Sequence, residues 1–301
     1  MKLSVHILTY NSERYIKDAI DSVLNQKINF PFELVIGDDA STDNTFKILQ
    51  DYAKTYEHVK PFQNKKNLGI LKNFKNTLDQ CSGEYIFDLA GDDWIHNEIG
   101  LQKMVEKLES NPNLGFIDSG YNVFYEHRNK STYFHNKNIL NKVTYRNHML
   151  TTGSPTLGCC FRKNALDLYV DFDLYIKKGF KIEDYPILAD LTSNCTYDFI
   201  YESFVTYRVR KTSYSSNFHD FFDMKMFFVN KYNLGNDAVQ KIEENYFQTK
   251  LIHASLHFRP KDGALAFSKI KKRRLKQYLL YISSQSKFCF KILWFFRRLA
   301  L

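Results

Sequence analysis

The fold is decided by the stretch "KLSVHILTYNSERYIKDAIDSVLNQKINFPFELVIGDD", residues 2–39. Residues 3–9 form a short apolar run rich in large and β-branched side chains, which predicts a buried strand. Apolar residues recur at helical spacing over 15–24 and predict an amphipathic helix. Residues 32–39 predict a second strand that ends in glycine and two aspartates. Strand, helix and strand in this order indicate a parallel α/β unit.

The same alternation continues outward from this unit. Helices are predicted over 41–56 and 72–81, and strands over 59–64 and 84–93. We therefore expect an α/β protein with a Rossmann-like, mostly parallel sheet flanked by helices. In such sheets ligands gather at the carboxyl ends of the strands. Both Asp-Asp pairs of this region, Asp38–Asp39 and Asp92–Asp93, follow directly after predicted strands.

The pattern changes once along the chain. Mixed strand and helix patterns continue to about residue 215, and from about Phe218 onward the pattern is wholly helical. We predict an α/β domain over 1–215 and a helical C-terminal region over 216–301.

The charge is distributed unevenly. The chain of 301 residues carries 42 Lys and Arg against 33 Asp and Glu, a formal net charge of +9. Ten of the basic residues follow the last acidic residue, Asp262, so the preceding part has 42 − 10 = 32 basic against 33 acidic residues and is close to neutral. A basic tail of this kind indicates a polyanion or an anionic membrane as partner.

The cysteines and the apolar runs indicate a compartment. Five cysteines without a CxxC spacing support neither a disulfide framework nor a zinc site, and we expect a reducing cytosol. The N-terminal apolar run is too short for a signal peptide. We also expect no transmembrane helix, since no apolar stretch approaches the ~20 residues that one needs.

The two Asp-Asp pairs admit two readings. Aspartate commonly caps helices, and a predicted helix follows each pair. Two adjacent pairs at two strand ends are harder to explain as caps. Hard cations such as Mg²⁺ and Mn²⁺ take carboxylate oxygens together with substrate phosphates. A divalent cation that bridges to a diphosphate is therefore the favoured reading.

Several motifs together resemble the family 2 glycosyltransferases, which are inverting, nucleotide-sugar-dependent enzymes with a GT-A fold. The matching segments are "LSVHILTYNSERYIKDAIDSVLNQ", "FELVIGDDASTDNT", "NKKNLGILKNFKNTLDQCSGEYIFDLAGDDW", "EDYPILADL" and "YRV". They cover about residues 1–215 in the family's order. The resemblance implies transfer of a sugar from a nucleotide-diphosphate sugar, most simply a UDP-sugar, to a glycan or lipid-linked acceptor in bacterial surface polysaccharide synthesis.

The resemblance also implies residues that bind the donor nucleotide. In "GDDAST", Asp39 resembles the aspartate that receives the imide of the base, and Asp38 shapes the same pocket. Thr9 and Tyr10 resemble the residues that line the nucleobase and ribose. Lys72 in "NLGILKN" stands near a position where the family often has a basic residue beside the nucleotide.

The metal and catalytic positions follow from the resemblance in the same way. "AGDD" resembles the metal motif, with Asp92 and Asp93 as carboxylates, but Ala90 stands where an acidic residue is usual. "IEDYP" resembles the motif that supplies the catalytic base, here Asp184. Arg210 stands where many relatives carry histidine, and an arginine can pair with phosphate but cannot ligate a metal.

The C-terminal tail, "KIKKRRLKQYLLYISSQSKFCFKILWFFRRLAL", mixes basic clusters with Leu, Tyr, Phe and Trp. It predicts amphipathic helices in an anionic membrane interface, and hence a cytoplasmic protein held peripherally on the inner face of the cell membrane. We rank nucleic acid lower as a partner because the aromatic side chains cluster with Leu and Ile.

Two other functions remain open at this stage. A metal-dependent nucleotidyltransferase also uses paired aspartates on an α/β sheet, although it usually has a Gly- and Lys/Arg-rich phosphate loop near the first strand. A catalytically degenerate, membrane-held nucleotide-binding scaffold is supported by Ala90 and Arg210.

Overall fold

The computed structural model describes residues 1–134, 142–153, 155–210 and 221–292. The chain divides into two compact units. The first unit comprises Met1–Met149 with Gly153–Lys211, and the second comprises Leu150–Thr152 with Thr212–Leu301. The domain boundary predicted between residues 215 and 216 falls outside the described residues.

The first half of the first unit alternates strands and helices. Its elements are β1 (Leu3–Thr9), α1 (Ile16–Leu24), β2 (Phe32–Asp38), α2 (Thr45–Thr55), β3 (Val59–Gln63), α3 (Ile70–Gln80) and β4 (Tyr85–Ala90). Strand β1 pairs in parallel with β2 and β4, and β2 pairs in parallel with β3. The prediction of a parallel α/β sheet is correct for this half.

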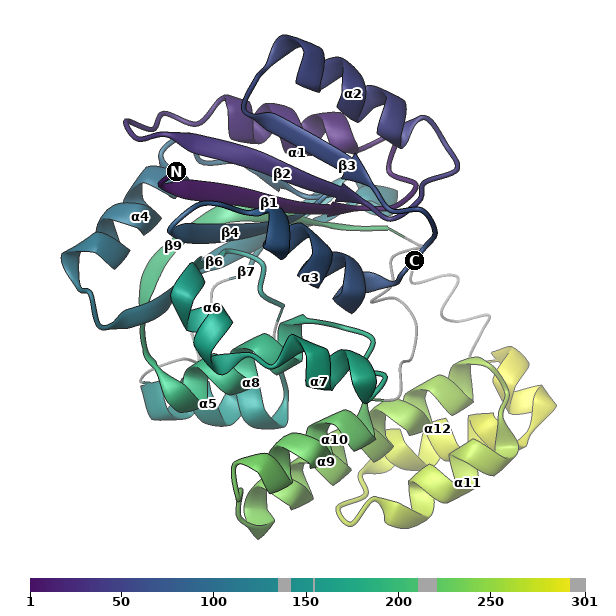
Figure 1. The fold of residues 1–301 in the computed structure, drawn as a ribbon. Coiled ribbons are helices and arrows are strands. Elements are labelled where there is room, and N and C mark those ends of the chain that lie inside the picture. Colours follow the sequence, from purple (N-terminus) through teal and green to yellow (C-terminus); the bar gives the residue numbers. More distant parts are fainter. Residues whose placement is uncertain (135–141, 154, 211–220, 293–301) are drawn as a thin grey trace. The chain divides into compact units, whose positions relative to one another are not determined.

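The two faces of β1 carry different side chains, because successive residues of a strand point to opposite faces. Leu3, Val5 and Ile7 are fully buried in the main apolar core, which also contains the apolar side of α1. On the other face, the ring of His6 packs on Phe74 of α3, with ring centroids 4.4 Å apart. Helices α1 and α3 therefore cover opposite faces of these strands (Figure 1).

The second half of the first unit is mixed. Its elements are β5 (Trp94–Ile95), α4 (Gly100–Ser110), β6 (Leu114–Tyr125), the 3-10 helix η1 (Glu126–Arg128), β7 (Lys130–Phe134), α5 (Lys142–Thr151), β8 (Cys159–Arg162), α6 (Lys163–Tyr169), α7 (Phe172–Lys177), α8 (Asp184–Asn194) and β9 (Thr196–Val209). The strand order is β3-β2-β1-β4-β8-β6-β9-β5, with β7 paired to β6. Strand β8 runs antiparallel to both β4 and β6 and so interrupts the parallel sheet, while β6 and β9 pair in parallel with each other.

The second unit is helical in its described part, as the sequence predicts. Its helices are α9 (Phe222–Lys231), α10 (Asn236–Leu256), α11 (Pro260–Lys269) and α12 (Leu275–Gln285). Leu251, Ala266 and Ile270 form a small buried cluster, and Leu280 and Tyr281 of α12 pack against it. Within the described residues, no helix is both long and apolar enough to span a membrane.

Candidate active site

The predicted donor residues follow three neighbouring strands. The sheet register pairs Thr9 of β1 with Asp38 of β2, and Leu8 with Ala90 of β4. The loops that start after these residues therefore leave the same edge of the sheet. Tyr10, Asp39 and Asp92 are the first or second residues of these loops, which is the arrangement expected of a ligand site in an α/β sheet.

Asp39 holds the loop that precedes α3. One carboxylate oxygen accepts hydrogen bonds from the backbone N–H of Leu68 (2.8 Å) and the side-chain amide of Asn64 (3.0 Å). The other oxygen accepts from the backbone N–H of Gly69 (2.9 Å). These bonds explain how a carboxylate that is only 4% exposed is accommodated.

Asp38 is fully buried and closes the turn after β2. Its carboxylate accepts hydrogen bonds from the backbone N–H of Ser41 (3.0 Å), the Ser41 hydroxyl and the side-chain amide of Gln63 (2.7 Å). Ala40 adopts a left-handed backbone (φ 61°), which is uncommon for a residue with a side chain. Asp38 and Asp39 thus fix two different loops at one strand end.

The remaining predicted nucleotide residues differ in exposure. Tyr10 is 49% exposed directly after β1. Thr9 is buried, and its hydroxyl has no hydrogen-bond partner among the described residues. Lys72 lies exposed in the first turn of α3. The structure therefore brings Thr9 and Tyr10 to the same strand edge as Asp39.

Asp92 and Arg210 form an ion pair, with 2.5 Å between an arginine Nη2 and a carboxylate oxygen. The Asp92 side chain is 18% exposed, so a ligand can reach it. The guanidinium of Arg210 stands in front of the carboxylate that the sequence assigns to a metal. Ala90, at the other end of the motif, has no side-chain atom that can ligate a metal.

The carboxylate of Asp93 has a different partner from that of Asp92. It is 2% exposed, and its carboxylate accepts a hydrogen bond from the backbone N–H of Arg208 (2.7 Å). Burial, together with the charge of the adjacent Asp92, raises the pKa of Asp93 well above its ordinary value. Its contacts tie the end of β4 to β9.

Arg208 is a residue that the sequence reasoning did not assign to the site. Its Nε donates to the backbone carbonyl of Asp92 (2.8 Å), and its guanidinium forms an ion pair with Asp18 of α1 (2.6 Å). The same guanidinium lies over the ring of Trp94, 4.6 Å from the ring centroid. The arginine in "YRV" was a usable signal, because a buried arginine at a strand end must find several acceptors.

Asp184 is the first residue of α8 and is partly buried. One carboxylate oxygen accepts hydrogen bonds from the backbone N–H (2.8 Å) and the hydroxyl (2.7 Å) of Thr156. Burial raises the pKa of Asp184 to about 6; the two Thr156 bonds act against this rise, and the nearby Asp88 adds to it. A carboxylate with such a pKa suits general-base catalysis near neutral pH.

Glu183 precedes Asp184 and lies deeper. It is 8% exposed, and one of its carboxylate oxygens has no hydrogen-bond partner among the described residues. Burial, followed by the charges of Asp184 and Asp88, raises the pKa of Glu183 well above its ordinary value. Two adjacent carboxyl groups thus differ in environment, and Asp184 is the more exposed one.

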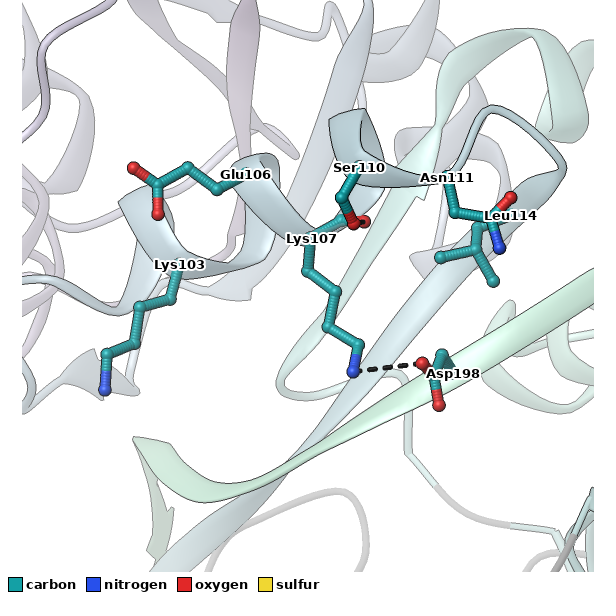
Figure 2. A pocket seen from close by; sticks show the side chains of 7 residues that line it. All are labelled: Lys103, Glu106, Lys107, Ser110, Asn111, Leu114 and Asp198. Atoms are coloured by element: carbon teal, nitrogen blue, oxygen red, sulfur yellow. Dashed lines mark hydrogen bonds and ion pairs between the residues drawn. The ribbon is translucent and has the colours of Figure 1, made fainter.

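A cavity of about 510 Å³ is lined by a different set of residues (Figure 2). It is lined by α4, the start of β6 and Asp198 of β9, and Lys107 pairs with Asp198 across it at 2.9 Å. None of the residues that the sequence assigns to donor, metal or catalysis lines this cavity. We therefore place the candidate active site at the strand edge and not here.

The chain belongs to glycosyl transferase family 2. The profile of the family described as "Glycosyl transferase family 2" matches residues 4–168, which is more than half of the chain. The predictions that the chain is a member of this family and that it has the GT-A fold are confirmed.

Several curated proteins are similar to parts of this chain. An uncharacterized protein of Mycobacterium tuberculosis is 35% identical over 133 residues, covering 44% of this chain and 38% of the relative. The chondroitin synthase of Escherichia coli is 30% identical over 188 residues, covering 58% of this chain and 26% of that protein. The alignments thus span well under two thirds of the relatives' lengths.

A solved structure shares the fold. The structure of residues 1–349 of Staphylococcus aureus TarS in complex with UDP-GlcNAc superposes with a TM-score of 0.62 and 21% sequence identity. The match covers 94% of this chain and 79% of that one. TarS is named a poly(ribitol-phosphate) beta-N-acetylglucosaminyltransferase.

Proposed function

We propose that the protein is an inverting glycosyltransferase that transfers a sugar from a UDP-sugar to a hydroxyl group of a glycan or lipid-linked acceptor in bacterial surface polysaccharide synthesis. One observation carries the proposal: Asp184, a partly buried carboxylate whose pKa is raised to about 6, lies in the unit that carries the family's Asp39 and Asp92 positions. The family membership and the UDP-GlcNAc complex of TarS support the choice of donor.

In this proposal Asp184 is the catalytic base. As the acceptor oxygen attacks the anomeric carbon, Asp184 takes the hydroxyl proton, and the bond between that carbon and the diphosphate oxygen breaks. The bonding electrons leave with the nucleoside diphosphate. Attack on the face opposite the leaving group inverts the configuration at the anomeric carbon.

The donor is held by the strand-end residues. Asp39 accepts the imide of the base, Asp38 supports the loop beside it, and Thr9 and Tyr10 line the nucleoside. Lys72 and Arg210 supply positive charge for the diphosphate, and a guanidinium pairs well with phosphate oxygens.

A divalent cation, Mg²⁺ or Mn²⁺, belongs to the proposal as a companion of the donor. Within the part of the chain that the structure describes, no three His, Cys, Asp or Glu side chains gather as a metal site. Asp92 is a reachable carboxylate, and magnesium is commonly held by one or two carboxylates plus substrate phosphates. When bound there, the cation would neutralise charge on the leaving diphosphate.

Arg210→His is expected to strengthen metal binding. The substitution removes the cation that pairs with Asp92 at 2.5 Å and adds an imidazole that can ligate. We expect the affinity for Mn²⁺ in the presence of UDP to rise roughly tenfold, a change of the size that ligand-shell substitutions cause. Isothermal titration of Mn²⁺ into the UDP complex measures it.

The matched control for this prediction is Arg128→His, which changes an exposed arginine of η1. If Arg210→His left the Mn²⁺ affinity unchanged and weakened only UDP binding, Arg210 would serve the diphosphate alone and the metal assignment of Asp92 would fail.

A donor screen tests the function as a whole. The full chain would be incubated with UDP-GlcNAc, UDP-glucose and GDP-mannose, with and without Mn²⁺, and both melting temperature and nucleotide release would be measured. We expect a UDP-sugar to stabilise the protein and to release UDP on turnover. A nucleotidyltransferase would instead release pyrophosphate from a nucleoside triphosphate, and a scaffold would bind UDP without turnover.

We also propose that the second unit attaches the protein to an anionic membrane. Four apolar residues of α12, spaced at i, i+3, i+4 and i+7, share one exposed face. They are Leu275 (74% exposed), Tyr278 (47%), Leu279 (56%) and Ile282 (47%). Lys271, Lys272 and Lys276 lie exposed around the start of this helix. An apolar stripe bordered by lysine suits the interface of an anionic bilayer.

The other apolar residues of the basic tail differ in whether the structure leaves them exposed for membrane contact. Phe288 is 72% exposed and remains a candidate contact. Leu280 packs in the second unit's buried cluster, so it is unsuited to membrane contact. Trp294 and Phe295, along with Phe296, lie outside the described residues. Membrane binding could be tested by truncating the tail near Ala264, but this would remove Ala266 and Ile270 from the buried cluster. Substituting exposed residues is therefore the cleaner test.

Replacing Leu275, Leu279 and Ile282 together by serine is expected to reduce sedimentation with vesicles of phosphatidylcholine and phosphatidylglycerol. Each serine substitution removes an apolar contact that salt does not screen. The lysines stay in place, and each contributes ~1 kcal/mol of electrostatic attraction that salt does screen. The control is Leu168→Ser, which removes a 73% exposed leucine from α6. Equal sedimentation of the triple variant and the control, or equal binding to neutral vesicles, would contradict this role.

A further inference from the structure

The hydroxyl of Thr156 lies between two carboxylates. Its oxygen is 2.7 Å from an oxygen of Asp184 and 2.9 Å from Oδ2 of Asp88, the latter on β4. Thr156 is 1% exposed, so water does not compete at this position. A threonine hydroxyl has one hydrogen and can donate it to only one of the two carboxylates at a time.

Asp88 has a second buried partner on the other side. Its Oδ1 lies 2.8 Å from Nδ1 of His6, which is fully buried. Nε2 of the same ring lies 3.1 Å from the backbone carbonyl of Phe74. A carbonyl carries no hydrogen, so Nε2 must be the donor in that contact. The contact between Nδ1 and Oδ1 of Asp88 then shares one further hydrogen.

The chain of contacts runs without interruption from β1 to α8. His6 orients Asp88, Asp88 faces Thr156, and Thr156 bonds to Asp184 through its hydroxyl and its backbone N–H. Whenever the Thr156 hydrogen is directed at Asp88, Asp184 loses one of two donors that stabilise its charged form. Competition for one hydrogen therefore connects Asp88 to the basicity of Asp184.

We propose that the buried His6–Asp88 pair, acting through Thr156, sets the orientation and the basicity of Asp184. In this role His6, Asp88 and Thr156 are positioning residues, since none of them contacts the reacting atoms in the mechanism above. The proposal rests on the proposed function, in which Asp184 is the base. It explains why a histidine and an aspartate are buried on neighbouring strands beneath the candidate site.

Other titratable groups surround this chain of contacts. Glu183, which precedes α8, adjoins Asp184, and its charged form would raise the proton affinity of its neighbour. Tyr121 of β6 and Cys159 of β8 are close enough to feel the charge of Asp184, and Asp118 of β6 interacts with both of them. Burial raises the pKa of all three, that of Asp118 to about 7. None of these groups is substituted in the variants below. A change in the pKa of Asp184 is therefore assigned to the substituted residues.

Two variants are expected to move the titration of Asp184 in opposite directions. Thr156→Val keeps the side-chain size and the backbone N–H bond but removes the hydroxyl, so the charged form of Asp184 loses a donor. We expect the Asp184 titration to shift upward by about 1 pH unit, as for one hydrogen bond to a charged group.

The second variant is the double substitution His6→Leu with Asp88→Leu. It removes both members of the pair together, so that neither His6 nor Asp88 is left buried without the other. The Thr156 hydroxyl then has Asp184 as its remaining carboxylate and donates to it without competition from Asp88. We expect the Asp184 titration to shift downward by about 1 pH unit.

The measurement is a ¹³C NMR titration of the full chain labelled at aspartate Cγ, with Asp184 assigned by comparison with Asp184→Asn. It needs no donor, so it decides the hydrogen-bond proposal even if the donor is misassigned. Asp190→Asn is the control, because it changes a buried carboxylate of the same helix that bonds to Tyr175. We expect this control to leave the Asp184 titration in place.

Shifts in one direction for both variants, or no shift in either, would overturn the proposal. Thr156→Val alone still decides it if the double variant does not fold, because an unshifted titration in that variant excludes the role of the hydroxyl. The pH profile of UDP-GlcNAc hydrolysis is the second readout, and its acid limb should follow the NMR shifts. NMR shifts without a matching change in the profile would remove Asp184 as the base, and with it the positioning role.

Discussion

Asp184→Asn is expected to lower the transfer rate by ~10²–10⁴-fold, the contribution that a positioned general base typically makes. The amide oxygen can still accept the two hydrogen bonds from Thr156, so the start of α8 should keep its place. What is lost is the ability to take the acceptor proton. Initial rates with the active UDP-sugar measure the effect, and isothermal titration should show nearly unchanged donor affinity.

The wild-type rate should also depend on pH with a definite sign. Asp184 must be ionised to act as a base, and its pKa is raised to about 6. The rate is therefore expected to fall as the pH is lowered through about 6, and Asp184→Asn should remove this limb. Asp190→Asn serves as the control on the same helix. If Asp184→Asn weakened donor binding and kept the turnover rate, Asp184 would belong to the donor site.

Asp92→Asn is expected to reduce transfer by roughly 10²–10³-fold, the range found when one preorganised electrostatic contact is removed. Asparagine preserves the shape of the side chain but loses the charge that pairs with Arg210 and would hold a cation. The measurement is the transfer rate at saturating Mn²⁺, with the melting temperature recorded beside it to show that the fold survives.

The control for this variant is Asp51→Asn, which removes an exposed carboxylate of α2 that pairs with Lys54. Full activity of Asp92→Asn at saturating Mn²⁺ would show that the carboxylate is dispensable. A loss that rising Mn²⁺ restores would indicate that Asp92 acts through metal affinity.

Local patterns predicted the first half of the fold well. In β1 and β2 the apolar runs are long enough to mark buried strands, and in α1 the buried residues Ile16, Ala19, Ile20 and Val23 follow helical spacing. Such patterns depend on neighbours within a few residues, so they are readable without the tertiary structure. The second half was less readable, since the pairing of β8 between β4 and β6 depends on residues far apart in the chain.

The residues of the candidate site also differ in how far the sequence alone could predict them. Through the resemblance to the family, the sequence predicts Asp39, Asp92 and Asp184 as site residues, because each stands in a short motif at a predicted strand end or helix start. It did not assign Arg208, Thr156, Asp88 or His6 to the site. The roles proposed for these residues rest on contacts across 28 to 190 positions of the chain, such as Arg208 with Asp18 and Thr156 with Asp184.

By itself, then, the sequence determined the α/β class, the strand ends at which the carboxylates lie, and the basic character of the tail. Only the tertiary structure decided which partner each carboxylate has. Asp92 faces a guanidinium, Asp93 faces a backbone N–H, and Asp184 shares one hydroxyl with Asp88. The physical reason is that an aspartate's chemistry depends on burial and on the few groups within hydrogen-bond distance, and folding brings those groups from distant segments.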